Sequence, residues 1–467
     1  MDRSMHQRSS RRIQQQEERV SPLELNAEKR DMASSPTLAM NEAVARRKAE
    51  GKRTFHLGFG EATFPLHPRL HTALTQAVTS TQYAPVAGLP RLRQAIAQYV
   101  KRTRGIDCDA EQVIVGPGSK PLIYALLQIL AGDVLVPVPS WVSYEPQARL
   151  AGRQVIKVAT YPADAQRLTP DALSEALRFG RAHGANPRIL VINSPGNPTG
   201  GMFSEDNVLA LADWASEQGI TIISDEIYAE LAHGWRPHIS PARFYPEGCI
   251  VTGGISKAFS AGGWRLGYAI LPRGVGGERA GKALRALASE IWSSASTPVE
   301  EAAIVAFTPD TELEAHMQRS ACLHGYVTGQ LHATLVELGI QCPRPAGGFY
   351  LYPDFSPWQP SLQRQGITSN VSLAEYLLDR WDIATLPGVV FGEEPATLRL
   401  RLATSMLYRS PDAQTPQEQN ARLWHLLSLA DNLPEADANQ AEPALELPEL
   451  VSVQERWREL FEYLQHV

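Results

Sequence analysis

The sequence predicts an α/β fold: a large domain built on a mainly parallel, helix-covered sheet, followed by a smaller α+β domain. Between about residues 105 and 298, short runs rich in β-branched residues alternate with segments that read as helices. This alternation is typical of a parallel sheet with helices on its faces. After Pro298 the pattern changes to long helices and only a few short strands, which indicates a second domain.

Before residue 106 we expect a helix at 40–51, a strand that runs into a glycine-rich loop at 53–64, and a helix at 90–105. The alternating strands and helices that follow occupy the segments 112–130, 133–152, 188–219, 220–231 and 249–260. In the second domain, short strands are expected at 347–355 and 397–405.

These patterns divide the chain into five parts. They are a loosely attached tail at 1–33, an N-terminal segment of the small domain at 34–66, a large domain at 67–300, a small domain at 301–410 and a helical extension at 411–467. The extension ends in an amphipathic segment that carries Trp457 and Phe461. We expect this segment to pack within its own chain, with packing on a partner subunit as the alternative.

The composition favours an enzyme or a small-molecule binding protein. With a net charge of −6, the chain lacks the basic balance of a nucleic-acid-binding protein. No apolar run approaches the roughly 18–20 residues of a membrane span, and the four cysteines are scattered, so we expect a cytoplasmic protein with reduced thiols. We expect no metal site, and we expect His233 and His238, in a loop-like stretch, to face solvent.

Five polar or aromatic residues fall where predicted strands end: Ser119, Trp141, Asn197, Asp225 and Lys257. Ligands of open α/β sheets bind beyond the carboxyl ends of the strands, so these side chains are expected on one rim. Each alone is more often structural, but five together indicate a site. A charged residue after a buried strand is costly unless it has a partner or a function.

Lys257 indicates the chemistry. The chain has eight lysines, and only Lys257 lies among small residues at the end of an apolar run, GGISKAFSAGGWRLGY. A desolvated lysine loses part of its preference for the ammonium form and can form Schiff bases. Such a lysine, facing a carboxylate and an aromatic ring, suits a carbonyl cofactor better than a metal.

Four stretches, NSPGNPTG, SDEIYAEL, SKAFSAGGWRLGY and RLRLATS, together resemble the class I and II aminotransferases, which bind pyridoxal 5'-phosphate on the type I fold. The resemblance runs from about Ser35 to Ser405, and the motifs occur in the family's order. It implies that an amino group passes between an L-amino acid and a 2-oxo acid through a Schiff base and pyridoxamine phosphate.

The resemblance also implies roles for single residues. Lys257 would hold the cofactor and move the Cα proton, and Asp225 would pair with the pyridine nitrogen. Tyr228 and Asn197 would hydrogen-bond the cofactor's O3′ oxygen, and Trp141 would lie against its ring. Asn197 and Trp141 would also contact the substrate.

The cofactor phosphate would be bound at a strand end and the following helix start. Gly118, Ser119 and Lys120 offer backbone N–H groups there, Ser256 offers a hydroxyl and Arg265 a guanidinium.

The resemblance also assigns residues outside the predicted phosphate-binding group. Tyr83 matches a tyrosine that reaches the phosphate of the neighbouring subunit, which implies a homodimer with shared sites. Gly60 matches a loop glycine that closes over the substrate. Register with ATS makes Arg399 the match for the arginine that binds the substrate α-carboxylate, and Arg401, two residues along the same strand, is the other candidate.

Departures from the family leave alternatives open. Ala62 and Thr63 stand where Pro-Asp is common, Glu300 stands where glutamine is frequent, and SEIWSSAST lacks an arginine for a second carboxylate. A neutral or basic substrate side chain is therefore at least as plausible as aspartate. The same Schiff base could also lead to elimination, cyclisation, decarboxylation or oxidation, and a remote alternative is a regulator that lost catalysis.

Overall fold

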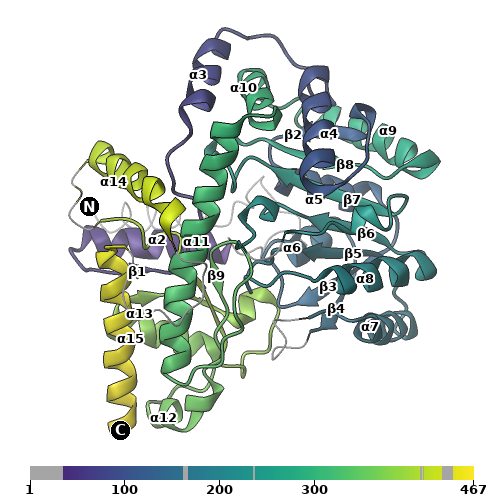
Figure 1. Ribbon diagram of the computed structural model, residues 1–467. Coiled ribbons are helices and arrows are strands. Elements are labelled where there is room, and N and C mark those ends of the chain that lie inside the picture. The colour runs from purple at the N-terminus through teal and green to yellow at the C-terminus, as the bar shows by residue number, and fades with distance from the viewer. Residues whose placement is uncertain (1–34, 161–166, 235–236, 411–412, 414, 434–444) are drawn as a thin grey trace, which may run out of the picture. The chain divides into compact units, whose positions relative to one another are not determined.

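The computed structural model describes residues 35–160, 167–234, 237–410, 413, 415–433 and 445–467. The region from Pro36 to Val467 forms one compact unit (Figure 1). The predicted tail at 1–33 lies outside the described residues.

A seven-stranded sheet forms the centre of the large domain. Its strand order is β2-β8-β7-β6-β5-β3-β4, and only β8 runs antiparallel to its neighbours. The strands are β2 (Val113–Gly116), β3 (Asp133–Val138), β4 (Val155–Ala159), β5 (Pro187–Asn193), β6 (Thr221–Asp225), β7 (Cys249–Gly254) and β8 (Gly267–Ile270). The predicted mainly parallel sheet is therefore confirmed.

Helices cover both faces of this sheet (Figure 1), because its strand side chains alternate between two apolar cores. Val113 and Val115 of β2 belong to one core, and Ile114 belongs to the other. Helices on the first face are α4 (Pro90–Arg104), α7 (Pro170–Ala182) and α8 (Glu205–Gln218). Helices on the second face are α5 (Ser119–Ile129), α6 (Tyr144–Leu150) and α9 (Gly274–Ile291).

The first core continues past residue 300. Phe307 of α10 (Thr297–Phe307) and Met317 of α11 (Thr311–Glu337) belong to it, while Leu323 of α11 belongs to another core that fills the small domain. Helix α11 therefore connects the two. The helix α3 (Pro68–Ala77) packs on α10.

The small domain combines segments from both ends of the unit. β1 (Phe55–His56), from the N-terminal part, pairs with β10 (Ile383–Ala384), and β12 (Leu400–Ala403) lies between β11 (Leu386–Pro387) and β9 (Tyr350–Leu351). Its helices are α2 (Pro36–Ala49), α12 (Gln359–Arg364) and α13 (Asn370–Trp381).

The C-terminal extension packs on this domain. α14 (Pro416–Leu429) and α15 (Pro448–His466) both contact α11, and Figure 1 shows α15 alongside it. Trp457 and Phe461 are fully buried and stack on Phe355, with ring centroids 5.7 and 6.3 Å away. The expectation that the last segment packs within its own chain is confirmed. In the part of the chain that is described, no helix has both the length and the apolar character needed to span a membrane.

Candidate active site

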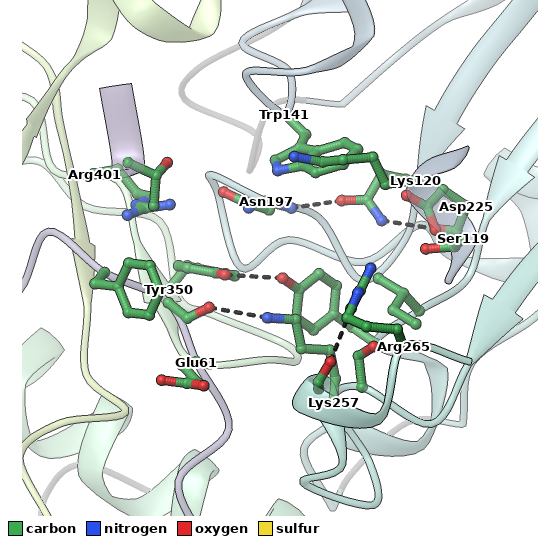
Figure 2. A pocket seen from close by; sticks show the side chains of 18 residues that line it. Glu61, Ser119, Lys120, Trp141, Asn197, Asp225, Lys257, Arg265, Tyr350 and Arg401 are labelled. Carbon is green, nitrogen blue, oxygen red and sulfur yellow. Dashed lines mark hydrogen bonds between the residues drawn. The ribbon is translucent and has the colours of Figure 1, made fainter. Parts of the chain in front are cut away.

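A cavity of about 350 Å³ lies at the carboxyl ends of the central strands, between the sheet and the small domain. Figure 2 shows Arg401 and Tyr350 on one side of it and Asp225, Ser119 and Lys120 on the other. Ten predicted residues line the cavity: Gly60, Ser119, Lys120, Trp141, Asn197, Asp225, Tyr228, Ser256, Lys257 and Arg265. Parallel strands bring these residues together because their carboxyl ends meet at one sheet edge.

Asp225, the last residue of β6, supplies a buried carboxylate. Its Oδ2 accepts a hydrogen bond of 2.7 Å from the Tyr144 hydroxyl, and no ion pair to it forms among the described residues. Burial raises the pKa of Asp225 to about 6. A cationic group bound beside it would therefore remove a real electrostatic cost.

Lys257 follows β7 and points its amine into the cavity. The Nζ atom donates a 2.9 Å hydrogen bond to the Gly60 carbonyl oxygen and lies 5.7 Å from the centre of the Tyr228 ring. Burial lowers the pKa of Lys257 to about 8, so the neutral amine is accessible near physiological pH. The predicted nucleophilic lysine has the environment that such chemistry needs.

The turn after β5 aims Asn197 into the cavity. Gly196 N donates to Gly201 O and Gly200 N to Gly196 O, both at 2.8 Å, while Asn197 N donates to Asn193 Oδ1 at 2.7 Å. These bonds fix the backbone, so the side-chain direction is set. Asn197 Oδ1 is buried without a hydrogen-bond partner in the described part of the chain, which leaves an acceptor for a bound group.

The structure corrects the choice between the two arginines. Arg399 does not line the cavity: its Nε donates to Asp354 at 2.9 Å and its Nη1 to Glu393 at 2.7 Å. Arg401 lines the cavity instead, is 2% exposed, and forms no ion pair within the described residues. A two-residue step along an extended chain moves a side chain by about 7 Å, enough to separate the two environments.

Arg401 is held by neutral groups. Its Nη2 donates to the Gly58 carbonyl oxygen at 2.5 Å, and its Cζ lies 5.0 Å from the centre of the Tyr350 ring. Its Nε is buried without a hydrogen-bond partner among the described residues. A buried guanidinium with free donors is a strong site for a carboxylate.

The opposite end of the cavity carries a second group of anion donors. Gly118 does not itself line the cavity, but a Cβ atom there would lie 2.4 Å from Arg265 Nη2, so this glycine leaves room for the guanidinium. Its φ of 104° also favours glycine. Ser119 follows it as the first residue of α5, so the helix N-terminus faces this end.

Tyr83 lies outside the cavity and is 90% exposed. Its loop is tied to α10, because the Thr297 hydroxyl donates to the Gln82 carbonyl oxygen at 2.6 Å. At the other end of the loop, Leu89 N donates to Glu300 Oε2 at 2.7 Å. The loop therefore presents an exposed phenol from a fixed base.

The expectation for the two histidines is wrong. His233 and His238 are 3% and 7% exposed: His233 Nε2 lies 2.9 Å from Gly348 O, and His238 Nε2 lies 3.1 Å from Glu226 Oε2. Both serve buried polar networks. Within the described residues, no cluster of three or more His, Cys, Asp or Glu side chains is arranged to hold a metal ion.

Sequence reasoning missed seven lining residues and named an eighth, Arg401, only as the lesser candidate for the carboxylate. The available signal for Tyr350 was the stretch GGFYLYPDF, in which this tyrosine comes two residues after two consecutive glycines, in a segment that reads as a short strand. The lining residues beyond the ten predicted ones are Thr37, Phe59, Glu61, Asn193, Ile227, Gly262, Tyr350 and Arg401.

Comparison with known proteins places these features in a family. The model described as aminotransferase class I and II matches residues 54–407. An aspartate aminotransferase of Bacillus subtilis is 33% identical over 384 residues, which cover 80% of this chain and 93% of the relative. An aspartate/prephenate aminotransferase of Thermus thermophilus is 33% identical over 379 residues, with the same shares covered. The solved structure of the Thermus thermophilus aspartate aminotransferase with maleate has a TM-score of 0.74 and 31% identity, covering 88% of this chain and all of that one.

Proposed function

The chain belongs to the class I and II aminotransferase family, and on that premise we propose that its cavity binds pyridoxal 5'-phosphate and exchanges an amino group between an L-amino acid and a 2-oxo acid. One observation carries the proposal. A single cavity joins a partly buried amine, Lys257, a buried carboxylate, Asp225, and a buried guanidinium free of carboxylate partners in the described chain, Arg401.

The residues present fit this cofactor. Ser119, Lys120, Ser256 and Arg265 form a cationic, hydrogen-bonding end that suits a phosphate. Asp225 supplies the anion that a protonated pyridine nitrogen requires, and burial already makes that carboxylate costly without a partner. Asn197 and Tyr228 would hold the phenolic O3′ oxygen, and Trp141 offers a ring face.

When bound, pyridoxal phosphate supplies an aldehyde carbon and a ring that withdraws electrons from the substrate's Cα atom. The chain's own contribution is proton handling and orientation. Lys257 Nζ, with a pKa of about 8, takes and returns protons near neutral pH. Arg401 binds the α-carboxylate and thereby fixes which substrate atoms face Lys257.

The names of the relatives suggest which substrate to test first. Relatives of this chain are named aspartate aminotransferases. Aspartate is therefore the first donor to test, beside neutral and basic amino acids. A screen of amino donors against several oxo acids measures this, and a dominant preference for a basic amino acid would contradict the choice of aspartate.

Two experiments test the function. Borohydride reduction of the protein saturated with pyridoxal phosphate should attach the label to Lys257, as peptide mass spectrometry would show, and Lys257→Ala should remain unlabelled. Single-turnover spectroscopy should show pyridoxamine phosphate and a free oxo acid. Release of an eliminated, cyclised, decarboxylated or oxidised product would favour another reaction of the same cofactor.

The proposal includes a homodimer in which Tyr83 completes the partner's site. The 90% exposure of the Tyr83 side chain, on a loop that is bonded at both ends, supports an interface at this loop. Mixing inactive Lys257→Ala with inactive Tyr83→Ala subunits should restore activity, because a hybrid dimer has one site with both residues intact. Separately purified variants that form dimers yet show no complementation would contradict shared sites.

A further inference from the structure

Tyr350, on β9 of the small domain, touches two functional side chains at once. Its hydroxyl oxygen lies 2.8 Å from that of Tyr228, and its ring lies under the Arg401 guanidinium. We propose that Tyr350 is a positioning residue with two separable parts: the hydroxyl directs the Tyr228 proton toward the cofactor's O3′ oxygen, and the ring holds Arg401 in place for the substrate carboxylate. This inference rests on the proposed function.

The packing around Tyr350 leaves it little freedom. A Cβ atom at Gly60 would lie 2.2 Å from the Tyr350 hydroxyl oxygen, and one at Gly200 would lie 2.3 Å from its carbonyl oxygen. Tyr350 also pairs with Ala403 in the β9–β12 ladder. Two glycines and a strand pairing therefore set the position of this side chain, which is 1% exposed.

A bound cofactor would decide which of the two hydroxyls, Tyr228 or Tyr350, donates the hydrogen bond between them. Burial raises the pKa of Tyr228 and of Tyr350, so both phenols keep their protons. One of the two hydrogens occupies the bond between them, and either oxygen can be its donor. An ionised O3′ oxygen accepts only, so Tyr228 would donate to it and Tyr350 would then donate to Tyr228. Successive bonds in one direction strengthen each other.

The ring has a different task. Arg401 lies between the rings of Tyr350 and Phe391, with Cζ 5.0 and 5.5 Å from their centres. Aromatic faces attract a guanidinium without neutralising its charge, so the group stays available for an anion. An acidic partner would hold Arg401 as firmly but would compete with the substrate, as Asp354 and Glu393 do for Arg399.

Tyr350→Phe tests the hydroxyl. In the cofactor-loaded protein, the pH midpoint of the visible absorption change should rise by about half a unit, because a weaker Tyr228 donor stabilises the O3′ anion less. Tyr352→Phe is the matched control. Tyr352 follows β9 directly, its hydroxyl donates to Glu393 at 3.0 Å outside the cavity, and the pH midpoint of this variant should stay unchanged. An unchanged or lowered midpoint in Tyr350→Phe would overturn this part.

Tyr350→Leu tests the ring. KM for both the amino acid and the oxo acid should rise about five- to twentyfold, while Tyr350→Phe keeps KM near the wild-type value. Equal KM values in the two variants would overturn the role of the ring. If Tyr350→Leu does not fold, the Tyr350→Phe titration still decides the hydroxyl, and Tyr350→Met, which fills similar space without an aromatic face, decides the ring by the same KM comparison. Failure of the wild-type protein to bind the cofactor at Lys257 would refute the proposed function instead.

Discussion

Replacing Arg401 with glutamine should remove the proposed anchor of the substrate carboxylate, and the burial and charge of Arg401 set the size of the effect. Arg401 is 2% exposed and has no acidic partner in the described chain, so water does not screen its interaction with a bound carboxylate. Loss of one member of a buried, hydrogen-bonded charge pair costs about 2–5 kcal/mol. At about 1.4 kcal/mol per factor of ten, a middle value near 3 kcal/mol lowers kcat/KM about 100-fold.

Arg399→Gln provides the matched control, because it removes the same charge two residues away. Asp354 and Glu393 already occupy the Arg399 guanidinium, so this variant should lose about 1–3 kcal/mol of stability and keep its KM within about threefold. Steady-state kinetics with each substrate varied separately, together with urea unfolding, measure both quantities. A large rise in KM for Arg399→Gln, with little change for Arg401→Gln, would refute the assignment.

Three further predictions concern the cofactor side of the cavity. In the cofactor-free protein, Lys257→Met should be more stable than wild type by about 3 kcal/mol at pH 7, since burial lowers the folded-state lysine pKa from 10.5 to about 8. This stability difference should vanish as the pH rises from about 8 past 10.5, where the lysine is neutral in the folded and the unfolded state. Denaturant unfolding at pH 7 and 10.5 measures the difference, and a value that does not change with pH would contradict the prediction. Gly118→Ala should weaken cofactor binding about tenfold or more in a fluorescence titration, because the added Cβ atom strains a backbone φ of 104° and displaces the Arg265 guanidinium. An unchanged affinity would show that Gly118 is not needed to make room for Arg265. Tyr83→Phe should weaken cofactor binding nearly as much as Tyr83→Ala, because both variants lack the hydroxyl that would bond the phosphate, and both should remain dimers on gel filtration. Wild-type affinity in Tyr83→Phe would contradict the phosphate contact.

The positions of the strand ends were predictable because short β-branched runs mark the strands in the sequence. Short β-branched runs that end in Asn197, Asp225 or Lys257 place these side chains on one rim for any parallel pairing of the strands. The strands β4 and β8 and the helix α7 were not identified, although they complete the sheet and its cover. In β4 the buried side chains of Ile156 and Val158 alternate with more exposed ones. The five-residue stretch VIKVA is too short for this alternation to indicate a strand on its own.

The arginine assignment needed tertiary structure. Arg399 and Arg401 share a strand face, and the sequence does not show that Asp354 and Glu393, 45 and 6 residues away from Arg399, approach it. His238 was misjudged for the same reason, because its loop-like surroundings gave no sign of the buried Glu226 carboxylate. In both cases the missing information was which acidic side chain approaches the residue in the folded chain.

The charge arrangement explains how one cavity could orient two different reactants. Lys120 and Arg265 make one end cationic, Arg401 makes the opposite end cationic, and the Lys257 amine lies between them (Figure 2). In the proposed function, a phosphate bound at the first end would fix the cofactor, and a carboxylate bound at the second would fix the substrate. An L-amino acid and its 2-oxo acid share that carboxylate, so the same anchor serves both halves of an exchange. The reacting carbon of either molecule is then presented to the same lysine, and that is the requirement that amino-group transfer in both directions imposes on a single site.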